Sequence, residues 1–191
     1  MFVASRCATH QEIEFKCSGA SFERMKLLFS GRNRMDIGHF YYLNDQYFVD
    51  FPDPNLMQNK ETVNGQVHDR PCFYTFQDTN TGLYWMIPFS SKVDKFVGIY
   101  NKKVQKYGKC DTIVFGEVLG HKKAFLIQNM CPITPKYIKN EYIDANTNVP
   151  VRINGILEKE LTSKAKRVLA LQRKGVPLIF PDVLKIEKEL L

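Results

Sequence analysis

Arg70-Pro-Cys-Phe-Tyr-Thr-Phe76 begins the stretch that decides the fold, and after the polar turn Asp78–Gly82 it continues as Leu83-Tyr-Trp-Met-Ile-Pro-Phe-Ser-Ser-Lys92. Two apolar runs joined by a short polar turn predict a β-hairpin. A hairpin brings the start of its first strand and the end of its second to one edge of the sheet. We therefore expect Arg70, Ser90, Ser91 and Lys92 to lie together, where a cation and hydroxyl groups are suited to binding phosphate.

The chain is basic, and its charge is unevenly distributed. Its 191 residues carry a formal net charge of +7, and 44% of them are apolar, enough for one ordinary core. Residues 36–69 contain one Lys or Arg and six acidic residues, whereas residues 70–191 contain twenty Lys or Arg and eleven acidic residues. This distribution favours an anionic partner for the basic part. Charge that serves only solubility is the alternative interpretation.

The five cysteines indicate neither a metal site nor a disulfide framework. They are odd in number and scattered, and no CxxC pair exists. Cys72 and Cys131 lie inside apolar runs, which predicts buried thiols. We expect no metal and no cofactor. We also expect a cytoplasmic protein without a membrane partner, because no segment is long enough to cross a bilayer and no secretion signal opens the chain.

The first 34 residues differ from those that follow. They mix Ser, Gly, Arg and Cys without a sustained apolar period, and Met35-Asp-Ile-Gly38 reads as the start of a folded unit. We expect residues 1–34 to be an N-terminal extension outside the folded unit and residues 35–191 to form a single domain. Deletion of the extension should then leave folding and activity intact.

Short aromatic and apolar runs predict further antiparallel strands around the central hairpin. We expect strands at 39–43 and 47–51, a hairpin of 112–115 with 124–128, and an irregular pair of 137–143 with 149–153. Residues 52–65 are expected to form a polar loop, and residues 120–123 a turn. Cross-strand pairs this close in sequence favour an antiparallel sheet over a parallel one.

Helices are expected in the second half of the chain. Residues 93–107 place apolar side chains on one face and lysines on the other. Residues 156–174 form a long amphipathic stretch that Gly175 and Pro177 should end, and a short helix should follow Asp182. The fold class is therefore α+β, a compact antiparallel β-barrel decorated with helices, including a long late amphipathic helix.

The order of these features over residues 36–191 resembles the ToxN/AbiQ family of type III toxin–antitoxin systems, and within it most closely the CptN branch. The resemblance rests on Phe40-Tyr41 followed by Tyr47, a polar loop, the strand that Arg70 opens, the tract Pro88-Phe-Ser-Ser91, the run Asp111-Thr-Ile-Val-Phe-Gly116, the run Phe125-Leu-Ile-Gln-Asn129, and the late amphipathic helix. Residues 1–34 lie outside it.

Membership of this family implies an SH3-like barrel of the PemK/MazF kind. It also implies the toxin of a type III system, a sequence-selective and metal-independent endoribonuclease that cuts mRNA. The antitoxin would be a repeat-encoded pseudoknot RNA that inhibits the toxin and is cut into units by it, and protein and RNA would close into a cyclic assembly. Phage defence is one role that such systems have.

The resemblance also assigns roles to individual residues. Tyr47 matches an early active-site tyrosine, which we expect to be exposed, Arg70 matches the basic residue that opens the next strand, and Ser90-Ser91 matches a Thr-Ser pair. The lysine that relatives place two residues after the key serine is replaced by Val93, so that Lys92 or Lys95 is its candidate substitute.

RNA brings its own nucleophile, the 2′-OH, so the protein has only to move protons and neutralise the phosphorane. Arg70 suits charge neutralisation because it stays ionised and offers paired donors. Ser91 could orient the reacting oxygens, and Lys92 could stabilise charge or shuttle a proton. Ser90 and Ser91 have a structural alternative, in which they end the strand and cap the following helix.

Other basic residues are candidates for RNA binding, and each could equally be part of an ordinary solvated surface. They are His68, Lys95, Lys102, Lys103, Lys106, His121, Lys122, Lys123, Lys166 and Arg167. On chemistry alone His68 is also an acid–base candidate, since it stands two residues before Arg70. Lys164, Arg173 and Lys174 extend the candidate surface on the late helix.

Two other functions remain open at this point. A non-catalytic RNA-binding barrel would use the same basic surface but would not cut RNA. A poison of DNA gyrase or of another protein target would be inhibited by a protein antitoxin and would be indifferent to RNA. Cleavage assays with Ser91→Ala distinguish the first alternative from an enzyme.

Overall fold

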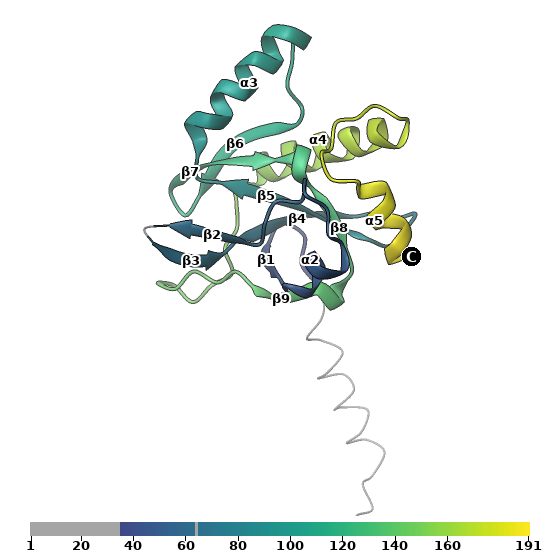
Figure 1. Cartoon of the computed structure of the whole chain (residues 1–191). Coiled ribbons are helices and arrows are strands. Elements are labelled where there is room, and N and C mark those ends of the chain that lie inside the picture. The colour runs from purple at the N-terminus through teal and green to yellow at the C-terminus, as the bar shows by residue number, and fades with distance from the viewer. Residues whose placement is uncertain (1–34, 64) are drawn as a thin grey trace, which may run out of the picture. The chain divides into compact units, whose positions relative to one another are not determined.

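A seven-stranded antiparallel sheet organises residues 35–63 and 65–191, which are the residues that the computed structural model describes (Figure 1). The predicted extension of residues 1–34 lies outside them. The sheet strands are β1 (Phe40–Leu43), β4 (Pro71–Gln77), β5 (Tyr84–Ser90), β6 (Ile113–Val118), β7 (His121–Leu126), β8 (Cys131–Ile133) and β9 (Ile138–Glu141). Their order is β6-β7-β5-β4-β1-β9, and β8 also pairs with β5.

The central strand β5 has two successive neighbours along one of its sides. Its first half pairs with β8, where Trp85 is opposite Pro132, and its end pairs with β7, where Phe89 is opposite Phe125. The short 3-10 helix η2 (Ile127–Asn129) joins β7 to β8. β5 is therefore paired on this side along both parts of its length.

Aromatic side chains fill the concave side of this curved sheet. The ring of Phe40 on β1 lies 5.4 Å from that of Phe89 and 6.4 Å from that of Phe125, although β4 and β5 separate β1 from β7 in the sheet. The sheet is nevertheless open, because β6 and β9 end the strand order and do not pair with each other among the described residues. The expected α+β class is confirmed, and closure of the strands into a barrel is not observed.

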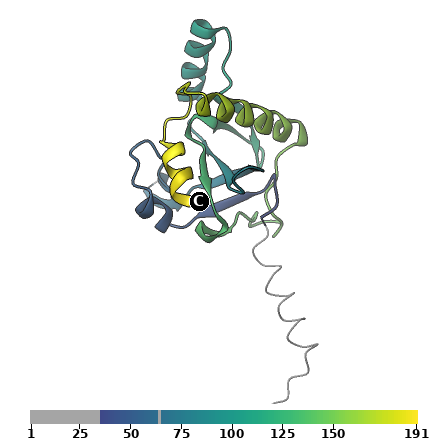
Figure 2. The same ribbon diagram turned by 90° about the vertical axis from the view of Figure 1, so that its right-hand side faces the viewer.

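The helix α4 (Gly155–Arg173) covers the aromatic core, as Figure 2 shows. Asn154 caps its start by accepting a 2.7 Å hydrogen bond from the N–H of Ile156. Leu161, Ala165 and Val168 are buried on its inner face, in agreement with the predicted stripe. Its close approach requires Gly116 on β6, because a Cβ there would lie 2.1 Å from a methyl group of Leu157.

Helix α3 (Val93–Tyr107) has the predicted bounds but projects from the sheet, as Figure 1 shows. Phe96 is its one buried residue, whereas the predicted apolar face leaves Val97 and Tyr107 exposed. Helix α5 (Val183–Leu190) ends the chain and buries Val183 and Ile186. None of the described helices combines the length and apolar character needed to span a bilayer.

The segment between β1 and β4 differs from the prediction. Residues 47–51 were expected to be a strand, but α2 (Gln46–Asp50) is helical, and its start is fixed by a 3.2 Å hydrogen bond from the N–H of Tyr47 to the side chain of Asn44. The expected polar loop of residues 52–65 contains the strand β2 (Lys60–Val63), which forms a separate hairpin with β3 (Gln66–Asp69) just after it. An irregular strand pair was predicted for residues 137–143 with 149–153. In the structure the short 3-10 helix η3 (Pro135–Tyr137) precedes β9, and the two segments meet in an isolated bridge.

Candidate active site and nucleic-acid interface

The hairpin of β4 and β5 brings Arg70 and Ser90 to one edge of the sheet. Cys72 is opposite Pro88 in the last recorded pair at this end. Two further residues along each chain lead to Arg70, just before β4, and to Ser90, the last residue of β5, so both stand at this end of the hairpin. Ser90 shares the sheet face of Pro88, and hence of Cys72, because alternate residues of a strand share a face. The predicted hairpin is present, and the close approach of Arg70 to Ser90, Ser91 and Lys92 stays a prediction.

The loop before β2 holds Arg70 in place. The backbone N–H of Arg70 donates a 2.6 Å hydrogen bond to the carbonyl of Asn59, and its guanidinium donates a 2.8 Å bond to the carbonyl of Gln58. Asn59 is itself buried and donates through its amide to the carbonyl of Leu43 and the carboxylate of Asp45, each at 2.9 Å. The end of β1 thus fixes the loop, and the loop fixes the arginine.

Ser90 and Ser91 have different environments. Ser90 is buried, and its hydroxyl oxygen accepts a 3.2 Å hydrogen bond from the backbone N–H of Lys92. Ser91 is exposed in the bend between β5 and α3, as is Lys92. Ser90 therefore supports the start of α3, while the hydroxyl of Ser91 and the ammonium of Lys92 are accessible to a ligand. Val93, the first residue of α3, is half-buried.

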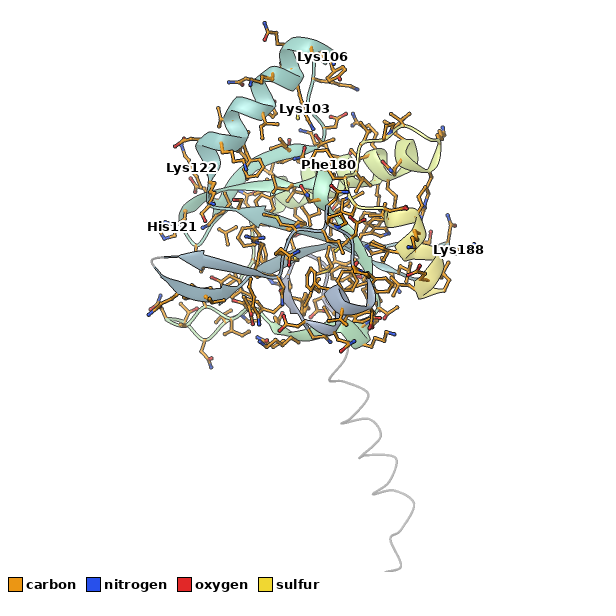
Figure 3. The ribbon with its side chains drawn as sticks, in the orientation of Figure 1. Lys103, Lys106, His121, Lys122, Phe180 and Lys188 are labelled. Atoms are coloured by element: carbon orange, nitrogen blue, oxygen red, sulfur yellow. The ribbon has the colours of Figure 1, made fainter. Side chains whose placement is uncertain are left out.

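Strand β7 extends the same edge on the other side of β5. Ala124 is opposite Ser90, and Lys122, two residues earlier on β7, shares the face of Ala124. Lys123 faces the opposite side, where it pairs with Gly116, and His121 begins the strand (Figure 3). These basic residues were expected in a turn, but the turn is formed by residues 119–120. Lys122 thus shares a sheet face with Ser90.

Tyr47 does not lie where the sequence predicted. It is fully buried, and its hydroxyl donates a 3.0 Å hydrogen bond to the carbonyl of Pro132. Its ring packs between Phe51 and Tyr137, at 5.1 and 5.2 Å between ring centroids. Burial raises the pKa of Tyr47 well above its usual value. The prediction of an exposed tyrosine is wrong because the segment is helical and turns this side chain inward.

The lysines of α3 fall into two groups. Lys95, Lys102 and Lys106 are exposed, as a basic face requires. Lys103 is half-buried, and its ammonium donates hydrogen bonds of 2.7 Å to both Thr112 and Gln128. The expected position of Lys103 on the solvated face is therefore wrong. His68 is exposed on β3, two residues before Arg70.

On α4, Lys166 and Arg167 are exposed, and each has a neighbour. The ammonium of Lys166 lies 5.4 Å from the ring centroid of Phe76, and Arg167 lies 3.3 Å from the carboxylate of Asp111. Arg173 has a structural role, because it forms ion pairs with both Asp78 and Glu187. Those two carboxylates occupy the guanidinium that was expected to be available to RNA.

The two hollows recorded on the surface do not contain the edge residues. One is lined mainly by residues 51–55 and by α5, and the other lies between the β4–β5 turn and α4, where Lys166 and Arg173 line it. Within residues 35–63 and 65–191, no three His, Cys, Asp or Glu side chains are grouped to hold a metal ion.

Comparison with solved structures identifies the fold. The structure of AbiQ, a lactococcal anti-phage endoribonuclease of a type III toxin–antitoxin system, matches over 80% of this chain and 94% of its own, at 12% identity and a TM-score of 0.58. A bacterial type III toxin that a non-coding RNA pseudoknot inhibits matches over 81% of this chain and 96% of its own, at 17% identity and a TM-score of 0.54.

The chain has the ToxN/AbiQ fold. No protein-family model matches the sequence, and neither does any curated protein. Within the ToxN/AbiQ fold, Arg70 stands just before the first strand of the β4–β5 hairpin, and Ser90 and Ser91 stand at the end of the second.

The residues that hold Arg70 in place were not predicted from the sequence. Gln58 and Asn59 position Arg70 through their backbone carbonyls, and backbone contacts leave no signature in residue type. The shared face of Lys122 and Ser90 could have been predicted from the pairing of β5 with β7. It was not predicted because the strand was expected to begin at residue 124, whereas β7 begins at His121.

Proposed function

We propose that this chain is the toxin of a type III toxin–antitoxin system and that it is an endoribonuclease. The proposal is supported by the ToxN/AbiQ fold and by the placement of Arg70 and Ser90 at the same end of the β4–β5 hairpin, with Ser91 next in the chain. We regard the curved, open sheet as a variant of the small SH3-like barrel. We retain the CptN branch as the proposed relationship within the family.

The proposed reaction is transesterification of the RNA backbone. The 2′-oxygen attacks the adjacent phosphorus as its proton leaves, the bond from phosphorus to the 5′-oxygen breaks, and that oxygen takes up a proton. The products are a 2′,3′-cyclic phosphate and a 5′-OH. No group outside the RNA and the protein is consumed in this step.

The chain's residues supply charge and orientation for this step. Arg70, held by the Gln58 carbonyl, offers guanidinium donors to the phosphate oxygens as negative charge accumulates on them. Ser91 is exposed at the same edge and orients a reacting oxygen. Lys92 is the proposed charge stabiliser or proton shuttle, and Lys122 on β7 adds a second ammonium on the face of Ser90.

The proposed partners are two kinds of RNA. Cellular mRNA is the substrate, and a repeat-encoded pseudoknot RNA is the antitoxin that the toxin cuts and with which it forms a cyclic assembly. One of the compared toxins is inhibited by an RNA pseudoknot, which supports the antitoxin part of the proposal. The proposed location is the cytoplasm, where mRNA is available.

The decisive experiment incubates the purified chain with mixed-sequence RNA in EDTA, beside Ser91→Ala, and maps the product ends. We expect cuts that end in cyclic phosphate and that Ser91→Ala abolishes while RNA affinity is retained. RNA that is bound but stays intact would support a non-catalytic RNA-binding protein instead. A chain that neither cuts nor binds RNA would contradict the toxin assignment and favour a protein-directed poison.

A further inference from the structure

The ammonium of Lys103 is fixed below α3 by neutral groups. It donates hydrogen bonds of 2.7 Å to the hydroxyl of Thr112 and 2.7 Å to the side-chain carbonyl of Gln128. Both acceptors are buried. Burial lowers the pKa of Lys103 below its usual value. No carboxylate lies within ion-pair distance of Lys103 among the described residues, so this partly desolvated cation lacks an anionic partner within that part of the chain.

An exposed aromatic ring lies beside this ammonium. Phe180 stands in the segment between α4 and α5, its side chain is 52% exposed, and its ring centroid lies 5.7 Å from the Lys103 ammonium. Its backbone N–H donates a 2.8 Å hydrogen bond to the carbonyl of Gln128, the residue that also holds Lys103. Figure 3 labels both residues, Lys103 on α3 and Phe180 below that helix. Gln128 therefore fixes the cation and the ring relative to each other.

The arrangement has unused capacity for a ligand. An ammonium has three donors, and Thr112 and Gln128 take two of those of Lys103, which leaves one. Lys103 approaches the ring of Phe180, and half of the side chain remains accessible to a second flat group. Lys102 and Lys106 flank Lys103 on α3 and are exposed, which adds positive charge along the same helix.

We propose that Phe180 and Lys103 form a nucleotide subsite, in which a base of single-stranded RNA stacks on Phe180 and a neighbouring phosphate pairs with Lys103. The subsite rests on the proposed function for its ligand and extends it beyond the cleavage edge. Stacking on an aromatic ring beside a cation is the general mode of single-strand binding, and it is tolerant of sequence. An acidic peptide would use the cation but would leave the exposed ring without a stacking partner.

Binding of a short, labelled, mixed-sequence RNA is measured by fluorescence anisotropy, with Ser91→Ala as the parent so that the RNA stays intact. We expect Phe180→Ala to weaken binding about 5- to 100-fold, because base stacking contributes roughly 1–3 kcal/mol. Phe180→Tyr should keep most of the affinity. Leu184→Ala, which truncates an exposed apolar residue on the neighbouring helix, is the matched control and should change affinity less than about twofold.

A second measurement reports on the subsite without replacing Lys103, whose hydrogen bonds to Thr112 and Gln128 help to hold α3. Phe180→Trp places an indole at the subsite, and its emission should be quenched on addition of RNA, whereas the parent contains only the buried Trp85. An RNA affinity that Phe180→Ala leaves unchanged, or an indole that RNA does not quench, would overturn the subsite. So would binding of oligoglutamate, but not RNA, with the same dependence on Phe180.

The subsite and the proposed nuclease fail in different ways. Cleavage is scored on the unaltered chain through its dependence on Arg70 and Ser91, whereas the subsite is scored through binding that depends on Phe180. RNA that binds through Phe180 but is never cut supports the subsite and contradicts the nuclease. RNA that is cut, and that binds equally well with and without the Phe180 ring, supports the nuclease and contradicts the subsite.

Discussion

The backbone N–H of Lys92 donates a 3.2 Å hydrogen bond to the hydroxyl oxygen of Ser90. This bond joins the last residue of β5 to the residue that precedes α3, and it occupies the side chain of Ser90 in holding the helix start. Ser91, next in the chain, is exposed. The two adjacent serines are therefore expected to have separable roles, one structural and one at the reacting phosphate.

Replacement of each serine by alanine tests this division. Ser90→Ala should lower the free energy of unfolding by about 1 kcal/mol, because a hydrogen bond at the helix start is lost. Ser91→Ala should leave stability within about 0.5 kcal/mol but abolish RNA cleavage. Urea unfolding and single-turnover cleavage measure the two effects. The reverse assignment, in which Ser90→Ala loses cleavage at full stability, would show that Ser90 is the reacting serine.

Arg70→Lys tests whether the site needs a guanidinium rather than only a positive charge. Lysine keeps the charge but cannot offer two parallel donors to a phosphate while one donor remains on the carbonyl of Gln58. We expect single-turnover cleavage to fall about 100-fold, the usual effect of losing a transition-state donor. Arg152→Lys, at an exposed position outside the candidate edge, is the matched control and should cleave normally. Equal rates for Arg70→Lys and the unaltered chain would remove Arg70 from the reaction.

Tyr47→Phe distinguishes a structural tyrosine from a reacting one. The lost hydroxyl donates a 3.0 Å hydrogen bond to the buried carbonyl of Pro132, so we expect a loss of about 1–2 kcal/mol in stability. Cleavage per folded molecule should be unchanged, because the ring is fully buried. Thermal unfolding and a cleavage assay well below the melting temperature give the two values. A large loss of cleavage at unchanged stability would contradict this and restore an active-site role to Tyr47.

The sequence predicts best the elements whose apolar residues follow one clear pattern or whose ends are marked by turn residues or glycine. The hairpin of β4 and β5 has two apolar runs around a polar turn, and Gly108 and Gly175, both with positive φ, end α3 and α4 where expected. The error at residues 47–51 has a physical cause. A run of five residues, four of them aromatic or apolar, fits one helical turn or one strand equally well, and the contact from Tyr47 to Asn44 selects the helix.

A signal for the missed hairpin was present in the sequence. Asn64-Gly65 is a dipeptide typical of tight hairpin turns, and Gly65 has a φ of +78°. The polar character of β2 and β3 concealed it, because these strands have no apolar alternation to mark them. The partners of Lys103 and Arg173 lie beyond any local pattern, since Lys103 meets Gln128 of η2, and Arg173 meets Asp78 of the β4–β5 turn and Glu187 of α5.

The ion pairs of Arg173 with Asp78 and Glu187 predict a stability effect that depends on pH. Burial raises the pKa of Asp78, but hydrogen bonds from Arg173 and the backbone of Asn80 outweigh it and leave the pKa lowered. A lowered folded-state pKa stabilises the fold above the unfolded pKa near 3.9, and this contribution is lost as pH falls through the folded value. The unaltered chain should therefore lose stability in the acid range.

Arg173→Met should lower stability by about 3 kcal/mol at pH 7, because it leaves two buried carboxylates without their cation. The stability difference between Arg173→Met and the unaltered chain should become smaller from pH 7 to pH 4. Without the guanidinium, burial raises the pKa of Asp78, so its carboxylate takes up a proton and the cost of a buried unpaired charge is removed. Urea unfolding across this range gives the difference. The exposed Lys174→Met is the control, with little effect at any pH. A deficit for Arg173→Met that does not vary with pH would contradict the ionic role.

The exposed lysines of α3 are predicted to contribute to RNA affinity through charge alone. Each phosphate contact contributes about 0.7 to the slope of log affinity against log salt for a single strand. The combined replacement of Lys95, Lys102 and Lys106 by Gln should therefore reduce the slope by about 2. A matched replacement of Lys136, Lys185 and Lys188 removes the same charge from other exposed positions and should leave the slope nearly unchanged. Equal slopes for the two variants would show that RNA responds to total charge and does not follow α3.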